Sequence, residues 1–335
     1  MSNNIVITGA TGLVGRNLIP KIIKVFPQKN ILCLVKKQEN SSESKGVAIL
    51  KKYAISVKNV DLESGYGLNN LPKNPKLIIH LAAETNTSKK NHKVNSTGVR
   101  NLYSAFHQLS SETHFIHIGT MVSVVGRKSC KNPIDENTSD HPTNEYTRTK
   151  VEGENFLVKK CLKDKFRLTI IRPNTIYGKS VRKNSLFDMV KNMISKKSII
   201  TRINWPGRSS LVHVDDVVKA ILFFSKTKPK AGVSEKYLLC AENLSISDIS
   251  KILHKNMHIK YRPINFPKWF WQIASKFRPL IPYFEKPLGT NLYNYLWRSS
   301  IIIDDVVWCK TNKINKVFKK WKPILFAEKG FKDII

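Results

Sequence analysis

The stretch Ile5-Val6-Ile7-Thr8-Gly9-Ala10-Thr11-Gly12-Leu13-Val14-Gly15 decides the fold. Its first four residues form a β-branched run typical of a buried strand, and apolar residues at helical spacing follow the glycines as far as Pro27. Glycines between a strand and a helix allow a tight turn, and the helix start offers unpaired N–H groups to a pyrophosphate. A plain turn is the alternative, since turns need glycine anyway. The stretch predicts a dinucleotide site made by Gly9, Thr11, Gly12, Leu13, Val14 and Gly15.

Short apolar runs continue to alternate with helical segments through the first half of the chain. Further strands are expected at residues 31–35, 55–60, 77–81 and 115–118, and the polar stretch 38–45 is expected to be a surface loop. This alternation predicts a doubly wound α/β fold, a Rossmann domain with a parallel sheet covered on both faces. After residue 172 prolines separate shorter elements, with helices expected at 217–225 and 247–253. We expect a dinucleotide-binding domain at 1–172, to which 212–240 returns, and a smaller substrate-binding cap at 173–211 and 241–335.

Composition excludes several classes of protein. With 335 residues and 41% hydrophobic content, the chain can bury a sizeable core. The 57 basic and 24 acidic residues give a net charge of +33, which invites a polyanionic partner. The basic residues are nevertheless spread over the chain without a nucleic-acid-binding motif, so we expect no specific nucleic acid. The five cysteines are too scattered for a zinc site, and the absence of a signal peptide or a long apolar run predicts a cytoplasmic protein.

The end of the second expected strand bears on which dinucleotide binds. A carboxylate there would bind a ribose 2′-hydroxyl, whereas a cation tolerates a 2′-phosphate. The sequence has Lys36 and Lys37, and Arg16 follows the third glycine. The cofactor is therefore expected to be NAD(P), with NADP favoured over NAD, although lysine is common everywhere in this chain.

Tyr146-Thr147-Arg148-Thr149-Lys150 is the most chemically specific segment. On a helix, Tyr146 and Lys150 share one face, and a nearby ammonium favours the phenolate that a tyrosine needs in order to act as a base. In a lysine-rich protein this spacing also arises by accident on a solvated helix.

Other motifs occur in a fixed order around this pair. They are Asp61-Leu62, His80-Leu81-Ala82-Ala83, Asn95 with Gly98, Arg172-Pro173-Asn174-Thr175-Ile176-Tyr177-Gly178, His213-Val214-Asp215-Asp216-Val217 and Trp321-Lys322-Pro323. Together with the glycine turn and the tyrosine–lysine pair, they resemble the extended short-chain dehydrogenase/reductase superfamily, of the NAD-dependent epimerase/dehydratase type. The resemblance spans nearly the whole chain.

The resemblance implies a role for each matching residue. Tyr146 would be the catalytic acid/base and Lys150 its partner, which also holds the nicotinamide ribose. The remaining cofactor contacts would come from Asp61, Leu62, Leu81, Ala82, Ala83, Asn95, Pro173, Asn174 and Thr175.

One position departs from the family pattern. The family places a serine or threonine five residues before the glycine of its "VYG" ending, and here Val124-Val125-Gly126 puts Met121 at that place. Methionine cannot donate a hydrogen bond. Thr120 is the first candidate to replace it, because a bulge can absorb a one-residue shift, and Ser123 is the second.

Short sequence segments similar to those of the nucleotide-sugar epimerases and dehydratases predict a nucleotide-sugar substrate. Arg208, then Arg182, could clamp its diphosphate, and Glu84 is a further substrate-binding candidate. The alternatives are an NADPH-dependent acyl-thioester or hydroxysteroid-like reductase and a non-catalytic nucleotide-binding scaffold. The resemblance also implies a homodimer, with the helix that carries Tyr146 as one candidate for its interface.

The segment from Phe266 to Phe284 is aromatic and basic. It could border an acyl channel or touch an anionic bilayer, which leaves peripheral membrane contact open. A cap helix that packs its aromatic residues inward is the favoured interpretation.

Overall fold

The main sheet follows from the short apolar runs of the first half. The computed structural model describes residues 4–36, 41–106, 109–179 and 185–334. Seven parallel strands lie in the order β3-β2-β1-β4-β5-β6-β9. Their bounds are β1 Ile5–Thr8, β2 Ile31–Val35, β3 Ser56–Asn59, β4 Leu77–His80, β5 His114–Ile118, β6 Arg167–Pro173 and β9 Ser234–Leu239. The order reverses between β1 and β4, so this is the doubly wound α/β fold that the sequence predicted.

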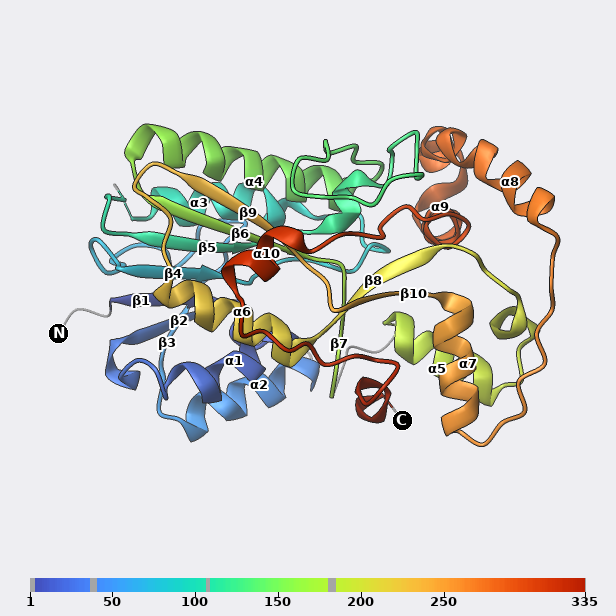
Figure 1. Ribbon diagram of the computed structural model, residues 1–335. Coiled ribbons are helices and arrows are strands. Elements are labelled where there is room, and N and C mark those ends of the chain that lie inside the picture. The colour runs from blue at the N-terminus through green and yellow to red at the C-terminus, as the bar shows by residue number, and fades with distance from the viewer. Residues whose placement is uncertain (1–3, 37–40, 107–108, 180–184, 335) are drawn as a thin grey trace.

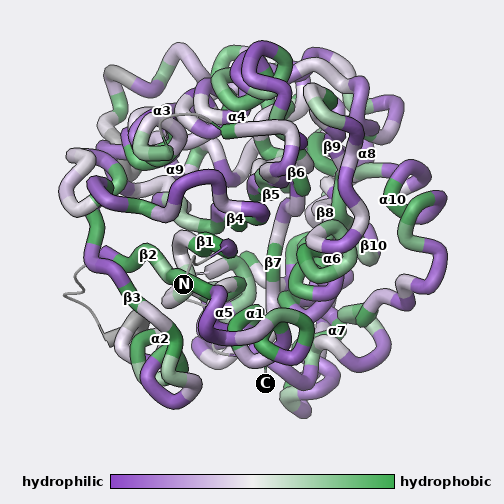
Figure 2. Tube along the Cα trace, turned by 90° about the vertical axis from the view of Figure 1, so that its left-hand side faces the viewer, coloured by the Kyte–Doolittle hydropathy of each residue, from purple (hydrophilic) through white to green (hydrophobic). Residues whose placement is uncertain are grey.

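Helices cover both faces of the sheet, as Figure 1 shows. One face carries α1 Leu13–Ile22, α2 Ser41–Lys52 and α6 Val214–Lys226, and the other carries α3 Thr97–Ser104 and α4 Glu145–Asp164. Each face has its own apolar core, one around Leu18, Ile22 and Ile221 and one around Leu102, Phe115 and Leu157. Figure 2 shows β1 and β2 as hydrophobic segments between these helices.

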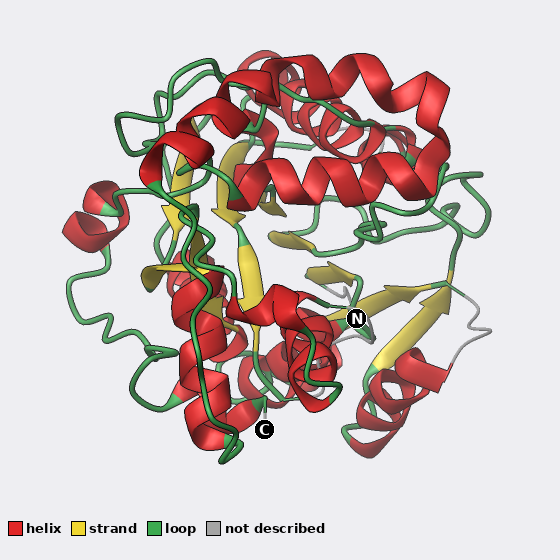
Figure 3. Cartoon of the chain, turned by 90° about the vertical axis from the view of Figure 1, so that its right-hand side faces the viewer, coloured by secondary structure: helices red, strands yellow, loops and turns green. Residues whose placement is uncertain are grey.

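A smaller unit stands beside the carboxyl ends of the strands. It has a three-stranded sheet of β7 Thr175–Tyr177, β8 Arg208–His213 and β10 Glu242–Ser245, and the helices α5 Leu186–Ser195, α7 Ile246–Asn256, α8 Lys268–Phe277 and α9 Glu285–Ile302. Figure 3 views this side, with helices around its strands. The chain leaves the main sheet where β6 gives way to β7 and returns with α6 and β9; the helix α10 Asn312–Val317 then packs on β9. The exact division into a Rossmann domain and a cap stays a prediction.

Two local expectations were wrong. The polar stretch 38–45 was expected to be a loop, but α2 begins at Ser41, because serine and glutamate are as compatible with the first turn of a helix as with a loop. The aromatic segment was expected to pack inward, but α8 has no buried residue. Within the described residues, no helix has both the length and the hydropathy needed to cross a bilayer.

Candidate active site

The glycine turn brings the start of α1 against the ends of two strands. Gly9 has a φ of +68°, and a Cβ there would lie 2.6 Å from the Ala82 nitrogen, just after β4. A Cβ on Gly15 would lie 2.3 Å from the Gly9 oxygen. Only glycine allows this close approach at both positions. Thr11 is buried beneath Gly46 of α2, whose Cβ would lie 2.4 Å from the Thr11 Cα.

The start of α1 has the properties that a pyrophosphate requires. Gly12 is its N-cap and provides no side-chain cap, and the first turn, with Leu13 and Val14 half-buried, has no acidic residue. Among the residues that the structure describes, a Cβ on Gly12 would meet the Gly9 oxygen alone, at 3.4 Å, so there is space beside Gly12. Unpaired N–H groups and open space at the positive end of a helix fit an anionic dinucleotide.

The predicted adenine side is organised around Asp61. Its carboxylate accepts hydrogen bonds from the backbone nitrogens of Glu63 and Ser64 and forms a 2.8 Å ion pair with Lys36. The hydrogen bond from Lys36 lowers the pKa of Asp61. Leu62 is buried. Arg16 is half-buried, and this burial lowers the pKa of its guanidinium. Lys36 thus lies at the end of β2, where the sequence argument requires it, but it already has an acidic partner. Lys37 lies outside the described residues.

Residues after β4 connect the turn to the catalytic helix. The Ala82 nitrogen donates to the Thr8 hydroxyl, and Leu81 to Ala83 are half-buried. Asn95 is buried; its amide oxygen accepts from the Glu84 nitrogen, and its amide nitrogen donates to the Glu84 oxygen and to Thr149 of α4. The Glu84 carboxylate is held 2.6 Å from Lys89. A substrate role for Glu84 would therefore require this ion pair to open.

The helix α4 starts at a fixed place because Asn144 and Thr147 form a capping box. This start places Tyr146 half-buried, with its ring centroid 5.8 Å from that of His92, and Lys150 one turn later. Lys150 is 5% exposed, and its ammonium donates a 2.6 Å hydrogen bond to the Ile118 oxygen at the end of β5. The predicted pair therefore lies at the carboxyl edge of the sheet, where doubly wound folds bind ligands.

Burial dominates the electrostatics around Lys150. It lowers the pKa of Lys150 to about 8, with Arg172 adding to the effect and Glu154 opposing it. Two buried histidines lie near the ammonium, His80 and His117, with their rings stacked at 5.4 Å. Burial lowers the pKa of His80 to about 3 and that of His117 well below its ordinary value, so both rings are neutral. The proton at this place therefore resides on Lys150 up to about pH 8.

The departure at Met121 has a structural counterpart. Met121 is fully buried in an apolar cluster with Val124 and Val125, in the 3₁₀ turn after β5. Thr120 caps this turn, its hydroxyl accepting from the Val122 nitrogen, and no described group accepts the proton of that hydroxyl. Ser123 is 1% exposed; its hydroxyl donates to the Thr120 oxygen and accepts from Arg172. Of the two candidates, Thr120 therefore has the uncommitted proton.

A buried ionic cluster that the sequence reasoning missed supports this turn. Arg172, 2% exposed at the end of β6, makes paired hydrogen bonds to Glu154 of α4 and to Asp140. Burial alone would lower the pKa of Arg172, but Glu154 and Asp140 outweigh it and raise that pKa. The signal was present: an arginine that ends the apolar strand Leu168–Ile171 needs a buried acid, and Glu154 lies one turn after Lys150.

The remaining candidates lie in and around the smaller unit. Asn174 and Thr175 are half-buried after Pro173, where the chain changes sheets. Arg208 is engaged in a two-pronged ion pair with Asp305 and lies 4.2 Å from the Trp308 ring, so clamping a diphosphate would compete with Asp305. Arg182 lies outside the described residues.

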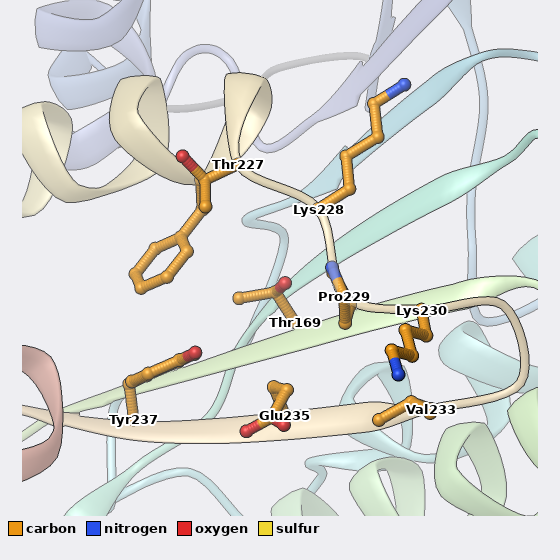
Figure 4. A pocket seen from close by; sticks show the side chains of 9 residues that line it. Thr169, Thr227, Lys228, Pro229, Lys230, Val233, Glu235 and Tyr237 are labelled. Carbon is orange, nitrogen blue, oxygen red and sulfur yellow. The ribbon is translucent and has the colours of Figure 1, made fainter. Parts of the chain in front are cut away.

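A hollow of about 320 Å³ lies elsewhere on the molecule. Figure 4 shows it between the end of α6 and the first halves of β6 and β9, lined by Thr169, Phe224, Thr227, Lys228, Pro229, Lys230, Val233, Glu235 and Tyr237. Its lining includes none of the predicted catalytic or cofactor residues.

The burial of Lys150 predicts a pH-dependent cost in stability. Lys150→Met is expected to raise the free energy of unfolding at pH 7 by about 1–3 kcal/mol, since it removes a desolvated ammonium but also a hydrogen bond. Between a native pKa of about 8 and an unfolded value near 10.5, the unfolded chain binds more protons, so the unsubstituted protein gains stability as the pH rises. Urea titrations without cofactor should therefore show the free energies of unfolding of Lys150→Met and of the unsubstituted protein converging toward pH 10. Lys159→Met, on the exposed side of α4, is the control, and a gap that stays constant with pH would contradict the assignment.

Comparisons with known proteins identify the family of this chain. Residues 5–240 match the model of the NAD dependent epimerase/dehydratase family. A curated relative, the N-acetyl-alpha-D-glucosaminyl-diphospho-ditrans,octacis-undecaprenol 4-epimerase of Escherichia coli O157:H7, is 26% identical over 275 residues, covering 78% of this chain and 76% of the relative. The chain also aligns, at 21% identity over 83% of its length, with only 7% of a polyketide synthase-nonribosomal peptide synthetase of Pyricularia grisea.

Solved structures share the fold at low identity. UDP-glucose 4-epimerase of Thermotoga maritima with UDP-glucose has a TM-score of 0.72 at 16% identity, covering 98% of this chain and 97% of that one. RMD of Pseudomonas aeruginosa, complexed with NADPH, has a TM-score of 0.64 at 16% identity over 98% and 97% of the two chains. With a family model that matches most of its length and the glycine turn, tyrosine and lysine in their places, the chain belongs to the NAD-dependent epimerase/dehydratase family of extended short-chain dehydrogenases/reductases.

Proposed function

We propose that the protein is an NAD(P)-dependent enzyme that epimerises, dehydrates or keto-reduces a nucleotide sugar. The observation that carries this proposal is the convergence of three features at one edge of the sheet. These are the uncapped start of α1, the buried ammonium of Lys150 and Tyr146 on the same helix face. The relatives supply the substrate class, because UDP-glucose is bound in one of the similar structures.

The proposed chemistry uses the side chains as they lie. When bound, the nicotinamide supplies a hydride acceptor and donor. The Lys150 ammonium favours the phenolate form of Tyr146, whose oxygen takes the proton of a sugar hydroxyl and, as the phenol, later returns it. Lys150 keeps its ammonium at neutral pH because it donates to the Ile118 oxygen and Glu154 lies one turn away. Water exclusion around Lys150, which is 5% exposed, strengthens its effect on Tyr146.

The experiment combines a substrate panel with a matched pair of variants. Purified protein is incubated with NAD, NADH or NADPH and with UDP-, GDP- and dTDP-sugars, their keto forms and an acyl-thioester, and the products are read by mass spectrometry and absorbance. Tyr146→Phe should lower kcat by about 100- to 10,000-fold, because the proton acceptor is lost. Tyr295→Phe, on an exposed tyrosine of α9, should leave kcat unchanged.

Each other outcome identifies a different function. Consumption of NADPH with the acyl-thioester alone would indicate an acyl-thioester reductase instead of a nucleotide-sugar enzyme. Consumption of NADPH with a ketosteroid alone would indicate the hydroxysteroid-like reductase. Cofactor binding without turnover of any substrate would indicate a nucleotide-binding scaffold.

We further propose that Thr120 binds the reacting oxygen in place of the family's usual hydroxyl. Its proton is uncommitted, whereas the Ser123 hydroxyl bonds Arg172 and the Thr120 oxygen. Thr120→Ala should lower kcat by about 100-fold with little change in cofactor affinity. Ser123→Ala should instead lower the midpoint of thermal unfolding, because Arg172 loses a buried partner. If both variants turned over substrate as fast as the unsubstituted protein, neither hydroxyl of this turn would bind the reacting oxygen.

We propose NADP as the preferred cofactor, with Lys36 as the residue that binds the 2′-phosphate and Arg16 beside it. Lys36 is 65% exposed at the end of β2, and its pairing with Asp61 keeps it at the ribose side. Lys36→Ala should weaken NADPH binding about tenfold and leave NADH binding nearly unchanged. Fluorescence titration with both cofactors measures this. Tighter binding of NADH that survives the substitution would establish NAD instead.

The expected homodimer through α4 also stays a proposal. This helix exposes Glu152, Lys159 and Lys163 together with Leu162, so an interface there would be mostly polar. Its test is the mass of the protein in solution.

A further inference from the structure

The helix α8 leaves most of its large apolar side chains on the outside. Its inner face holds Trp271, Ala274 and Ser275, and the Ser275 hydroxyl donates to Asp304. Its outer face holds Trp269, Ile273 and Phe277, which are 61%, 48% and 61% exposed. A helix that only covers a core shows the reverse pattern, with its large apolar side chains inside. The outer face therefore needs an explanation other than folding.

The apolar surface continues beyond α8 into the 3₁₀ turn η5, Arg278–Phe284. Leu280 is 48% and Tyr283 is 79% exposed there. We call the group Trp269, Phe270, Ile273, Phe277, Leu280 and Tyr283 the aromatic face. Figure 1 shows α8 at the outer edge of the smaller unit, away from the main sheet. An exposed apolar patch of this kind marks an interaction site.

The aromatic face is held rigidly. Arg278, 5% exposed, donates to the backbone oxygens of Val125 and Arg127, beyond the turn that carries Thr120. The Trp271 ring packs 5.2 Å from that of Trp205. The exposure is therefore built into the fold and does not come from a loosely attached segment.

Charge determines the partner. Between Asp248 and Glu285 the sequence has no acidic residue, yet it contains the exposed cations Lys251, Lys255, Lys260, Arg262, Lys268 and Lys276. Lys268 and Lys276 are exposed on α8 itself. A second copy of a chain with a net charge of +33 would bring like charges together at this surface, whereas an anionic bilayer complements them.

We propose that the aromatic face docks the protein on an anionic lipid bilayer. Tryptophan and tyrosine favour the headgroup region, phenylalanine and isoleucine enter its apolar boundary, and flanking lysines bind anionic headgroups. The next element, α9, fixes this region, because its buried Tyr293 and Trp297 donate to Thr143, just before the catalytic helix. Docking therefore holds the membrane surface at a fixed position relative to α4.

The test is co-sedimentation with vesicles of phosphatidylcholine containing about one third phosphatidylglycerol, against pure phosphatidylcholine. The full chain should bind the anionic vesicles at low salt and be released by about 0.5 M NaCl. Trp269→Ser with Phe277→Ser should weaken binding about tenfold or more, and Lys268→Gln with Lys276→Gln should weaken it at low salt only. Cofactor binding and the midpoint of thermal unfolding should stay unchanged, because none of these side chains is buried.

Matched controls remove the same chemistry elsewhere. Val57→Ser with Leu162→Ser takes away two exposed apolar side chains, and Lys159→Gln with Lys163→Gln takes away two exposed charges. Both should bind vesicles as the unsubstituted chain does. Equal loss in the controls, or no binding by the unsubstituted chain, would overturn the proposal. A dimer that becomes a monomer only in Trp269→Ser with Phe277→Ser would assign the aromatic face to self-association.

Discussion

The buried guanidinium of Arg172 connects the elements that make the site. It bonds Glu154 on α4, Asp140 in the loop before that helix and Ser123 in the turn after β5. An unpaired buried charge would cost several kcal/mol, so all three groups must be in place together. Lys236 of β9 adds a second cation 3.4 Å from Glu154. One strand end thereby fixes the catalytic helix, the turn and the neighbouring strand relative to one another.

The same cluster governs the lysine one turn away. Glu154 favours the ammonium of Lys150, whereas Arg172 and the loss of water oppose it, and the net result is a pKa of about 8. Because this pKa is close to neutral pH, a change in the surroundings of Lys150 alters its protonation more than it would alter that of an exposed lysine, whose pKa is higher. The neutral rings of His80 and His117 add no competing charge beneath it. The position of the proton thus follows from packing around β5 and β6.

Local pattern was enough to predict the first five strands of the main sheet and the glycine turn after β1, because strand runs and tight turns depend largely on neighbours in sequence. The strands at 5–8 and 31–35 lie where their β-branched runs predict them, and Gly15 is required by contacts with Gly9 and Ala10 of the same turn, whereas the approach of Gly9 to Ala82 after β4 is long-range. Helix spacing indicates which residues of α8 share a face. It does not indicate which face is inside, since that depends on the contacts of Ser275 with Asp304 and of Trp271 with Trp205. The Asp305 partner of Arg208 lies 97 residues away and left no local signal.

Met121 shows how the departure from the family pattern and the smaller unit are related. Its side chain is packed in one cluster with Val124 and Val125, and Trp297, Ile301, Val306 and Val307 from the far end of the chain complete that cluster. The position that the family gives to a hydroxyl has become part of the apolar contact between the two units. A polar side chain there would be buried without a partner, which costs roughly 1–3 kcal/mol. The hydroxyl that we propose for the reacting oxygen therefore lies outside this cluster, on Thr120, whose backbone is extended at the start of the turn.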